Sequence, residues 1–169
     1  MIQKRKKCVG LIFGGDSNEH YVSISSAKTV FKSLNSKSNR ERFKVKVFYI
    51  NKYGIWFDNN QSQKILQEDI TENKQDKNKT FQKGKINFLD KIDFQEVDIW
   101  FPVLHGLNGE DGAIHGLLKY TQKPFVGCGI LGSALGMDKI LMKKIFSYLK
   151  IPQVNYLAIQ NQNLNDKNI

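Results

Sequence analysis

The chain has 169 residues, of which 40% are hydrophobic, and this length supports one buried core or one domain with the start of a second. Its net charge is +10, but the lysines are scattered and show no aromatic–basic RNA-recognition pattern, so we expect a solvated surface and no nucleic-acid partner. Two cysteines, far apart in the sequence, do not suggest a disulfide framework and favour free thiols in a reducing, cytoplasmic compartment.

The first apolar run is too short for a signal peptide or a membrane span, so we expect no membrane association. It covers Val9–Phe13 and ends at once in Gly14–Gly15. A short apolar run bounded by glycines instead predicts a buried parallel strand over residues 7–13. Apolar residues at helical spacing over residues 22–34 then predict a helix that follows the glycine turn.

The middle of the chain alternates between apolar and polar segments. Residues 43–50 predict a second strand, and residues 55–58 predict a short one. Residues 59–93 are rich in Gln, Asn, Lys and Asp, and we interpret them as a surface insertion that is partly disordered. The continuous apolar run over residues 97–104 predicts another buried strand.

The remaining segments complete an alternating order of strands and helices. We expect a helix through residues 114–120, a short strand at 124–126, a glycine-bearing loop, a helix over 137–149 and a strand over 154–159. This order predicts an α/β fold with an open, mostly parallel sheet that carries helices on both faces.

Ligands of such sheets collect at the carboxyl ends of the strands. The first loop with this position runs from Gly14 to His20. Asp16 or Ser17 can simply cap the following helix, and this structural alternative stays open. Glu19 is not needed for a cap that Ser17 already supplies, so its carboxylate can instead hold an ammonium group.

The second loop runs from His105 to Gly112 and holds one imidazole, two carboxylates and three glycines. We favour a structural role for Glu110 and Asp111, as first-turn residues that match the helix dipole. His105 can be a histidine of the core, but it precedes the glycine turn. We expect it to face the same crevice as Glu19.

Two later features have competing interpretations. Residues 127–132 match the G-x-G-x-x-G pattern of dinucleotide-binding proteins, but the acidic residue expected about 20 positions later is missing, and we reject a dehydrogenase.

Lys139 begins a helix, where a cation opposes the dipole unless an anion lies nearby. Spacing alone favours the alternative, a solvated lysine.

Two stretches of the chain resemble the signatures of D-alanine–D-alanine ligases. The first runs from Gly14 to Ala27 and includes Ser17, Glu19, His20 and Ser23. The second holds these segments in the family's order: Phe101–Gly106, Gly109–Gly112, Gly116–Leu118, Pro124–Gly127, Ser133–Ala134 and Met137–Lys139. Two long signatures at matching separation are far more specific than a lone glycine motif.

The resemblance implies an ATP-grasp enzyme of peptidoglycan-precursor synthesis. In that family, ATP phosphorylates the carboxylate of one D-alanine, and the amine of a second attacks the acyl phosphate to give the dipeptide, ADP and phosphate. The resemblance implies that Glu19 holds the ammonium of the first D-alanine, with Val22 shaping its pocket and Ser23 supporting the loop. It also implies that His105 lies beside the reacting carboxylate and that Lys139 reaches the ATP phosphates.

The resemblance also implies a domain plan. It places a Rossmann-like pre-ATP-grasp domain over residues 1–150 and the start of a truncated ATP-grasp domain over residues 151–169. The family's serine-rich loop, arginine and magnesium ligands lie beyond this chain, so no metal site is assigned to it and we do not expect it to complete the ligase cycle alone. A homodimer is expected by resemblance only. His115 and Lys119 depart from the family's Gln and Glu, and we interpret both as surface drift.

Two other hypotheses stay open. The chain can be a standalone, non-catalytic binding or interaction module that keeps the fold, or, on weaker grounds, a basic nucleic-acid-binding domain. A reading frame that continues into a serine-rich loop and metal ligands would favour the ligase over the module, and salt-sensitive retention of DNA or RNA would favour the third hypothesis. The ligase interpretation fails if Glu19 and His105 lie on opposite sides of the fold.

Overall fold

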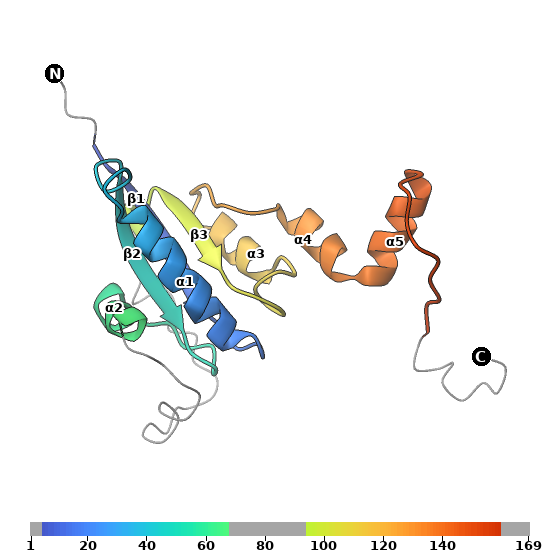
Figure 1. Cartoon of the computed structure of the whole chain (residues 1–169), viewed down its shortest axis with the longest axis horizontal. Coiled ribbons are helices and arrows are strands. Elements are labelled where there is room, and N and C mark those ends of the chain that lie inside the picture. The colour runs from blue at the N-terminus through green and yellow to red at the C-terminus, as the bar shows by residue number, and fades with distance from the viewer. Residues whose placement is uncertain (1–4, 68–93, 160–169) are drawn as a thin grey trace.

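The computed structural model describes residues 5–67 and 94–159, and its centre is a parallel sheet of three strands (Figure 1). The strands are β1 (Lys7–Gly14), β2 (Phe43–Ile50) and β3 (Ile99–Val103), in the spatial order β2-β1-β3. All three were predicted, and the parallel pairing confirms the expected sheet.

The central strand is β1, which pairs with β2 on one side and β3 on the other. Seven of its eight residues, from Cys8 to Gly14, are buried. A continuous apolar run is typical of a strand that is covered on both faces, and this explains why β1 lacks the alternation of a half-exposed strand.

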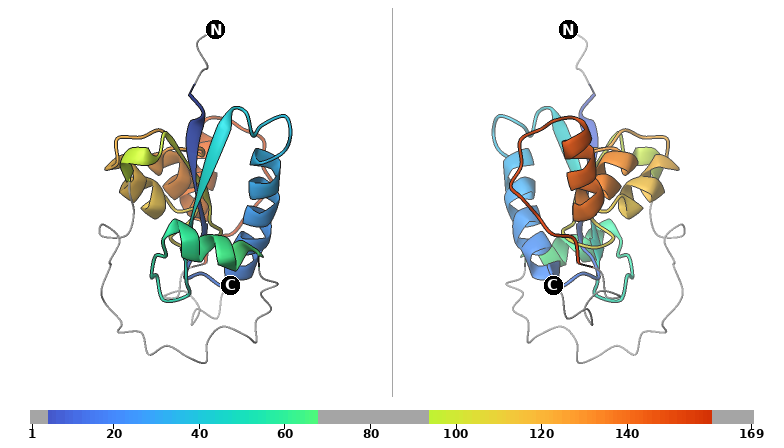
Figure 2. Two further views of the ribbon diagram at one scale, coloured as in Figure 1. Left: turned by 90° about the vertical axis from the view of Figure 1, so that its left-hand side faces the viewer. Right: turned by 90° about the vertical axis from the view of Figure 1, so that its right-hand side faces the viewer.

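Helices cover both faces of the sheet, as predicted (Figure 2). On one face, α1 (His20–Leu34) and α2 (Asn59–Gln67) pack over a core that includes Leu11, Phe13 and Ile24. On the other face, α3 (Ala113–Lys119) packs over a core centred on Ile12 and Trp100. A 3-10 turn, Phe94–Glu96, leads into β3.

The outer edge of β2 is covered by polar side chains of α2. The Oδ1 atom of Asn59 accepts a hydrogen bond from the Val47 backbone N–H at 2.9 Å. The Ser62 hydroxyl, which is fully buried, accepts one from the Tyr49 N–H at 2.8 Å. An edge strand leaves every second N–H unpaired, so these two side chains satisfy donors that would otherwise lack a partner.

The helix α2 corrects part of the sequence interpretation. Residues 59–67 were assigned to a partly disordered insertion, yet they form a helix that begins after Asp58, whose carboxylate accepts from the Gln61 N–H at 2.9 Å. Leu66 then reaches the core. Composition gave too few apolar anchors to indicate this helix, because its main contacts with the sheet are polar. The rest of the insertion, residues 68–93, lies outside the described residues.

Two predicted short strands are reduced to single bridges. Trp56 forms one antiparallel bridge with Ile50, and Phe125 forms one parallel bridge with Trp100 beside β3. The second bridge includes two backbone hydrogen bonds, from the Trp100 N–H to the Pro124 carbonyl at 2.9 Å and from the Val126 N–H to the Trp100 carbonyl at 2.8 Å.

The last third of the described chain differs most from the prediction. The expected glycine-bearing loop contains a helix, α4 (Ile130–Met137), and the expected helix over 137–149 is α5 (Lys139–Tyr148). A glycine within a helix lowers the stability of that helix by about 1 kcal/mol relative to alanine. Because this segment contains Gly132 and Gly136, a loop was the more plausible prediction. Residues 151–159 form no strand, since none of the three strands in the described residues pairs with them.

The helices α4 and α5 extend away from the sheet (Figure 1). No residue of α5 is buried, and apolar side chains such as Leu131, Val154 and Leu157 are more than 70% exposed. None of the helices in the described part of the chain combines the length and apolarity that a membrane crossing requires.

The turn after β1 depends on Gly14, and replacing it tests how tightly this edge is built. Its φ of +94° favours glycine, and an added Cβ would lie 2.1 Å from the carbonyl oxygen of Ile50. Gly54 also has a positive φ, +76°, but open space around it. We expect Gly54→Ala to destabilise the fold by about 1–2 kcal/mol and Gly14→Ala by roughly 3 kcal/mol or more, measured by urea unfolding. Equal losses in the free energy of unfolding of the two variants would show that the contact at Gly14 can relax.

Candidate functional site

Two loops meet at the carboxyl edge of the sheet, because they follow the adjacent strands β1 and β3. The Ser17 hydroxyl in the first loop donates to the His105 carbonyl in the second at 2.6 Å. A Cβ built on Gly106 would lie 3.3 Å from Ser17 Cβ and 4.0 Å from Glu19 Cδ. Glu19 and His105 therefore lie at the same edge of the sheet and not on opposite sides of the fold, while their facing one crevice stays a prediction.

A second contact joins the same loops. The Asn108 side-chain amide donates to both carboxylate oxygens of Asp16, at 3.1 and 3.2 Å. Asn108 has a positive φ of 64°, and its backbone N–H donates to the Asp111 carboxylate at 2.9 Å. The two loops are thus linked by two independent hydrogen-bonded contacts.

Buried Ser23 joins the loops to the strands beneath them. Its hydroxyl accepts a hydrogen bond from the Gly14 N–H at 2.8 Å and donates one to the Val103 carbonyl. These partners are the last residues of β1 and β3, so a single side chain of α1 links both strand ends. The predicted supporting role of Ser23 is a proposal that these contacts favour.

Glu19 stands at the start of α1 and is exposed. No side chain caps this helix, so the expectation that Asp16 or Ser17 caps it is wrong. Both side chains have other partners across the loop contact, and the Ser17 hydroxyl also accepts from the Glu19 N–H at 3.1 Å. Within the described residues the Glu19 carboxylate has no hydrogen-bond or ion-pair partner, and it can accept from a ligand's ammonium group.

The His105 imidazole lies between two side chains. Its Nε2 is 3.2 Å from the Ser26 hydroxyl, and its Nδ1 is 3.8 Å from Glu110 Oε1. The imidazole side chain is 29% exposed, so a ligand can reach it. Neutral imidazole both donates and accepts a proton, which suits a group that contacts a reacting carboxylate.

The acidic pair of the second loop orders the loop itself. The second carboxylate oxygen of Glu110 accepts from the Gly106 N–H at 2.8 Å, and Asp111 accepts from the Ala113 N–H at 2.9 Å. A structural role for Glu110 and Asp111 was predicted, but the prediction that they lie in the first turn of a helix is wrong. The helix α3 begins only at Ala113 and has no acidic residue in its first turn. Glu110 also faces His105, which the sequence interpretation did not include.

The site residues of α1 share one face of the helix. Glu19, Val22, Ser23 and Ser26 follow each other at spacings of three, one and three residues, and such positions line one side of an α-helix. Val22 is 54% exposed there. Ser26 was absent from the predicted site, although its helical spacing from Glu19 was a usable signal.

Lys139 lies in a neighbouring cleft of about 400 Å³. It is the first residue of α5, as expected, and its ammonium group donates to the Gly136 carbonyl at 2.8 Å. The Asp138 carboxylate caps the helix by accepting from two backbone N–H groups. Glu110 lines the same cleft, so Lys139 faces a space that borders the second loop.

His115 also lines this cleft and corrects the interpretation of surface drift. It is only 5% exposed, and its ring lies 5.0 Å from the Phe125 ring, centroid to centroid. The segment after Phe125 covers this flank of α3, which the helix pattern alone did not indicate. Burial lowers the pKa of His115, opposed in part by Asp111, and its Nδ1 has no hydrogen-bond partner within the described residues. Lys119 is exposed, as expected.

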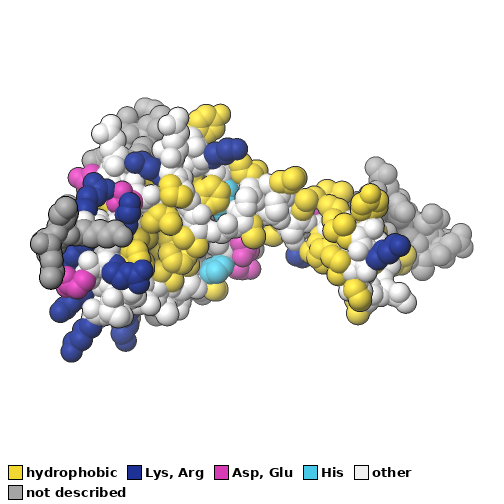
Figure 3. Space-filling view, turned by 90° about the horizontal axis from the view of Figure 1, so that it is seen from above, with side chains coloured by type: hydrophobic (Ala, Val, Ile, Leu, Met, Phe, Trp, Pro, Cys, Tyr) yellow, Lys and Arg dark blue, Asp and Glu magenta, His cyan; other side chains and the backbone are white. Residues whose placement is uncertain are grey.

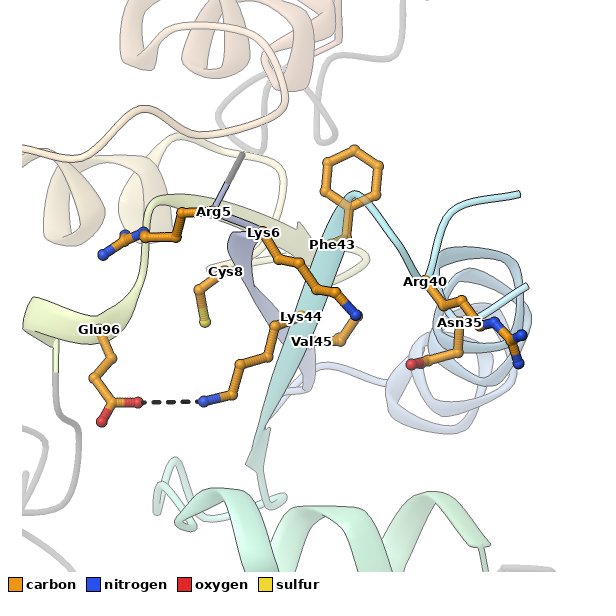
Figure 4. A pocket seen from close by; sticks show the side chains of 9 residues that line it. All are labelled: Arg5, Lys6, Cys8, Asn35, Arg40, Phe43, Lys44, Val45 and Glu96. Atoms are coloured by element: carbon orange, nitrogen blue, oxygen red, sulfur yellow. Dashed lines mark ion pairs between the residues drawn. The ribbon is translucent and has the colours of Figure 1, made fainter. Parts of the chain in front are cut away.

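A second, basic cleft of about 710 Å³ lies at the opposite, amino edge of the sheet (Figure 4). Arg5, Lys6, Arg40 and Lys44 line it, each within 4.0 Å of a carboxylate of Asp98, Glu41 or Glu96. The hydrogen bond and charge of Lys46 hold the pKa of Glu96 below its usual range.

The groups in this basic cleft do not combine into acid–base chemistry. Its thiol, Cys8, is buried, and burial raises its pKa. Both cysteines are free, as predicted. No three His, Cys, Asp or Glu side chains among the described residues are grouped so that they could hold a metal ion. The carboxyl edge is therefore the better candidate site.

Comparison with known proteins identifies the family of this chain. The family model described as "D-ala D-ala ligase N-terminus" matches residues 8–128. A D-alanine–D-alanine ligase of Prochlorococcus marinus subsp. pastoris is 69% identical over 100% of this chain and 48% of its own length. One from Prochlorococcus marinus strain NATL2A is 47% identical over 94% of this chain and 44% of its own length. The chain spans about half the length of the curated relatives it matches.

Solved structures show the same similarity. The D-alanine-D-alanine ligase from Coxiella burnetii superimposes on this chain with a TM-score of 0.74 at 27% identity. The match covers 96% of this chain and 48% of the Coxiella chain. The VanG D-Ala:D-Ser ligase from Enterococcus faecalis gives a TM-score of 0.67 at 28% identity, covering 94% and 46%.

Buried His115 predicts a pH dependence of stability. Because its pKa is lower in the folded than in the unfolded chain, the unfolded chain binds the proton more readily below the usual histidine pKa. The fold should therefore lose stability as the pH falls from about 7 to about 5. His115→Gln should flatten this part of the curve in urea unfolding. An unchanged slope in the variant would assign the effect to other groups.

Proposed function

The chain belongs to the family of D-alanine–D-alanine ligase amino-terminal domains, and we propose that it forms the part of an ATP-dependent D-alanine–D-alanine ligase that binds the first D-alanine. One observation carries this proposal: the Ser17 contact holds an unpaired carboxylate, Glu19, and an imidazole, His105, at one sheet edge. These two groups complement the ammonium and the carboxylate of an amino acid.

Glu19 provides the charge for the ammonium group. Its carboxylate is exposed beside the loop contact and can form charge-assisted hydrogen bonds, which are stronger than bonds between neutral groups. Val22, one helical turn further along the same face, is exposed and bounds the space for a small side chain. Ser23 keeps the loop in place through its bonds to both strand ends.

His105 provides the group beside the carboxylate that is phosphorylated. The carboxylate oxygen attacks the terminal phosphorus of ATP, ADP leaves, and the amine of a second D-alanine then displaces phosphate from the acyl phosphate. In both steps the chain's residues orient reactants and balance negative charge, which is the main source of rate in phosphoryl transfer. The contacts of His105 with Ser26 and Glu110 fit such an orienting role.

Lys139 is the residue that we assign to the ATP phosphates. It is exposed, it starts a helix and it lines the cleft that Glu110 borders. A phosphate group there would balance a cation that otherwise opposes the helix dipole. Magnesium accompanies ATP in such reactions, but the described residues offer no set of metal ligands, and no step is assigned to them.

The proposal includes a cytoplasmic location, where ATP is available, a homodimer and no nucleic-acid partner. The cations at the amino edge form ion pairs with carboxylates of this chain, which supports the proposal that it has no nucleic-acid partner. We also retain the domain plan, with the ligase domain over residues 1–150 and a second domain starting within 151–169.

A titration with D-alanine tests the binding site directly. We expect D-alanine, but not L-alanine, to shift backbone amide signals of residues 14–23 and 103–111 in NMR spectra. Glu19→Gln should weaken binding by roughly 10- to 100-fold, because one charge-assisted bond is lost. Glu41→Gln, at the amino edge, is the matched control and should bind normally. Equal affinity of the Glu19 variant and the wild type would contradict the assignment.

ADP release tests the ligase activity. With D-alanine and ATP, we expect a longer product of the same reading frame to release ADP in a coupled assay, and this chain alone to release little. Lys139→Ala in the longer product should raise the KM for ATP at least several-fold, since one phosphate contact is lost. D-alanine binding without ADP release in either product would instead favour a non-catalytic binding module.

A further inference from the structure

We propose that Ser26 is a positioning residue of this site, whose hydroxyl donates to Nε2 of His105 and thereby fixes the imidazole in one orientation with its proton on Nδ1. The geometry of the described residues carries this inference. Its consequence for D-alanine rests on the proposed function, because only there does His105 contact a substrate carboxylate.

The contact joins two elements that are distant in the sequence. Ser26 Oγ lies 3.2 Å from His105 Nε2, across 79 residues of chain. The other ring nitrogen, Nδ1, is 3.8 Å from Glu110 Oε1, which is too long for a hydrogen bond but close enough for the negative carboxylate to attract the positive end of an N–H dipole. The imidazole is therefore flanked by a hydroxyl on one side and a carboxylate on the other.

These neighbours select one neutral form of the ring. Neutral imidazole carries its proton on either Nδ1 or Nε2, and the partner of each nitrogen decides which form is favoured. The Glu110 carboxylate favours a proton on the nitrogen that faces it, Nδ1. Nε2 is then an acceptor, and the Ser26 hydroxyl is the donor that it needs.

Ser26 is held firmly enough to act in this way. On α1 it lies between Ser23 and Ala27, which are both fully buried. Ser23 is bonded to the ends of β1 and β3, and the His105 carbonyl is bonded to Ser17. The backbone on both sides of the Ser26–His105 contact is thus fixed, and the hydroxyl can determine the ring orientation.

Nitrogen NMR of histidine-labelled chain tests the proposal without any need for turnover. The shifts of the two ring nitrogens should identify the Nδ1–H form of His105 in the neutral wild type. Ser26→Ala should increase the fraction of the Nε2–H form several-fold and weaken the cross-peaks between the His105 ring and α1. Ser26→Thr, which keeps a hydroxyl, should resemble the wild type, and Ser25→Ala, at the exposed neighbouring position, should leave the ring unchanged.

Two results would overturn the proposal. One is an Nε2–H form of His105 in the wild type, and this outcome does not depend on how well any variant folds. The other is a natively folded Ser26→Ala chain whose ring signals match the wild type. Alanine is a better helix former than serine, so the variant should keep α1.

A D-alanine titration of the same variants separates this inference from the proposed function. Ser26→Ala should weaken D-alanine binding by about 3- to 10-fold, as expected for one lost hydrogen bond, and Ser26→Thr should restore most of the affinity. If the wild type does not bind D-alanine but the Nδ1–H form still depends on Ser26, the proposed function fails while the positioning role stands. If binding is normal in Ser26→Ala although the ring form changes, the consequence for D-alanine is overturned.

Discussion

The Ser23 hydroxyl bonds to the ends of two neighbouring strands at once, and the carboxyl edge of the sheet is built around it. It accepts from the Gly14 N–H and donates to the Val103 carbonyl, and its side chain is fully buried. A buried polar group without its partners costs free energy, so these bonds constrain where β1, β3 and α1 can lie relative to one another. Glu19 and Ser26, one turn before and about one turn after Ser23, reach the loops only because of this arrangement.

The charges of the molecule differ between the two edges of the sheet, because basic side chains outnumber acidic ones at the amino edge. Most of the lysine and arginine side chains in this view gather at one end, with some acidic side chains among them, and further acidic side chains lie beside histidine nearer the middle (Figure 3). At the carboxyl edge, the two loops carry Asp16, Glu19, Glu110 and Asp111, and Glu110 lies 3.8 Å from the His105 imidazole. The net charge of +10 therefore conceals an acidic edge, and the proposed binding of an amino acid's ammonium there, with Lys139 toward phosphate, is consistent with this distribution of charge.

The sequence predicted the features that depend on local pattern and missed those that depend on neighbours. The strand over residues 43–50 has the predicted bounds, because alternation and length identify it. The two loops were correctly placed at one edge, because the ends of the adjacent strands β1 and β3 determine where they lie. In contrast, the burial of His115 depends on a segment about ten residues further along. Residues 154–159 have a strand-like pattern, but no strand of the described part of the chain pairs with them. Ser26 was missed because its partner, His105, lies 79 residues away.

The side chains of α2 that occupy the outer backbone groups of β2 also limit what can be added to this protein. Asn59 and Ser62 already take the donors of Val47 and Tyr49, so another polypeptide would have to displace a helix before it could pair with this strand. Growth of the sheet by strand addition is thus blocked on one flank, and with it a common route to edge-to-edge aggregation. Any extension of the sheet has to occur on the opposite flank, beyond the bridge of Phe125 to Trp100.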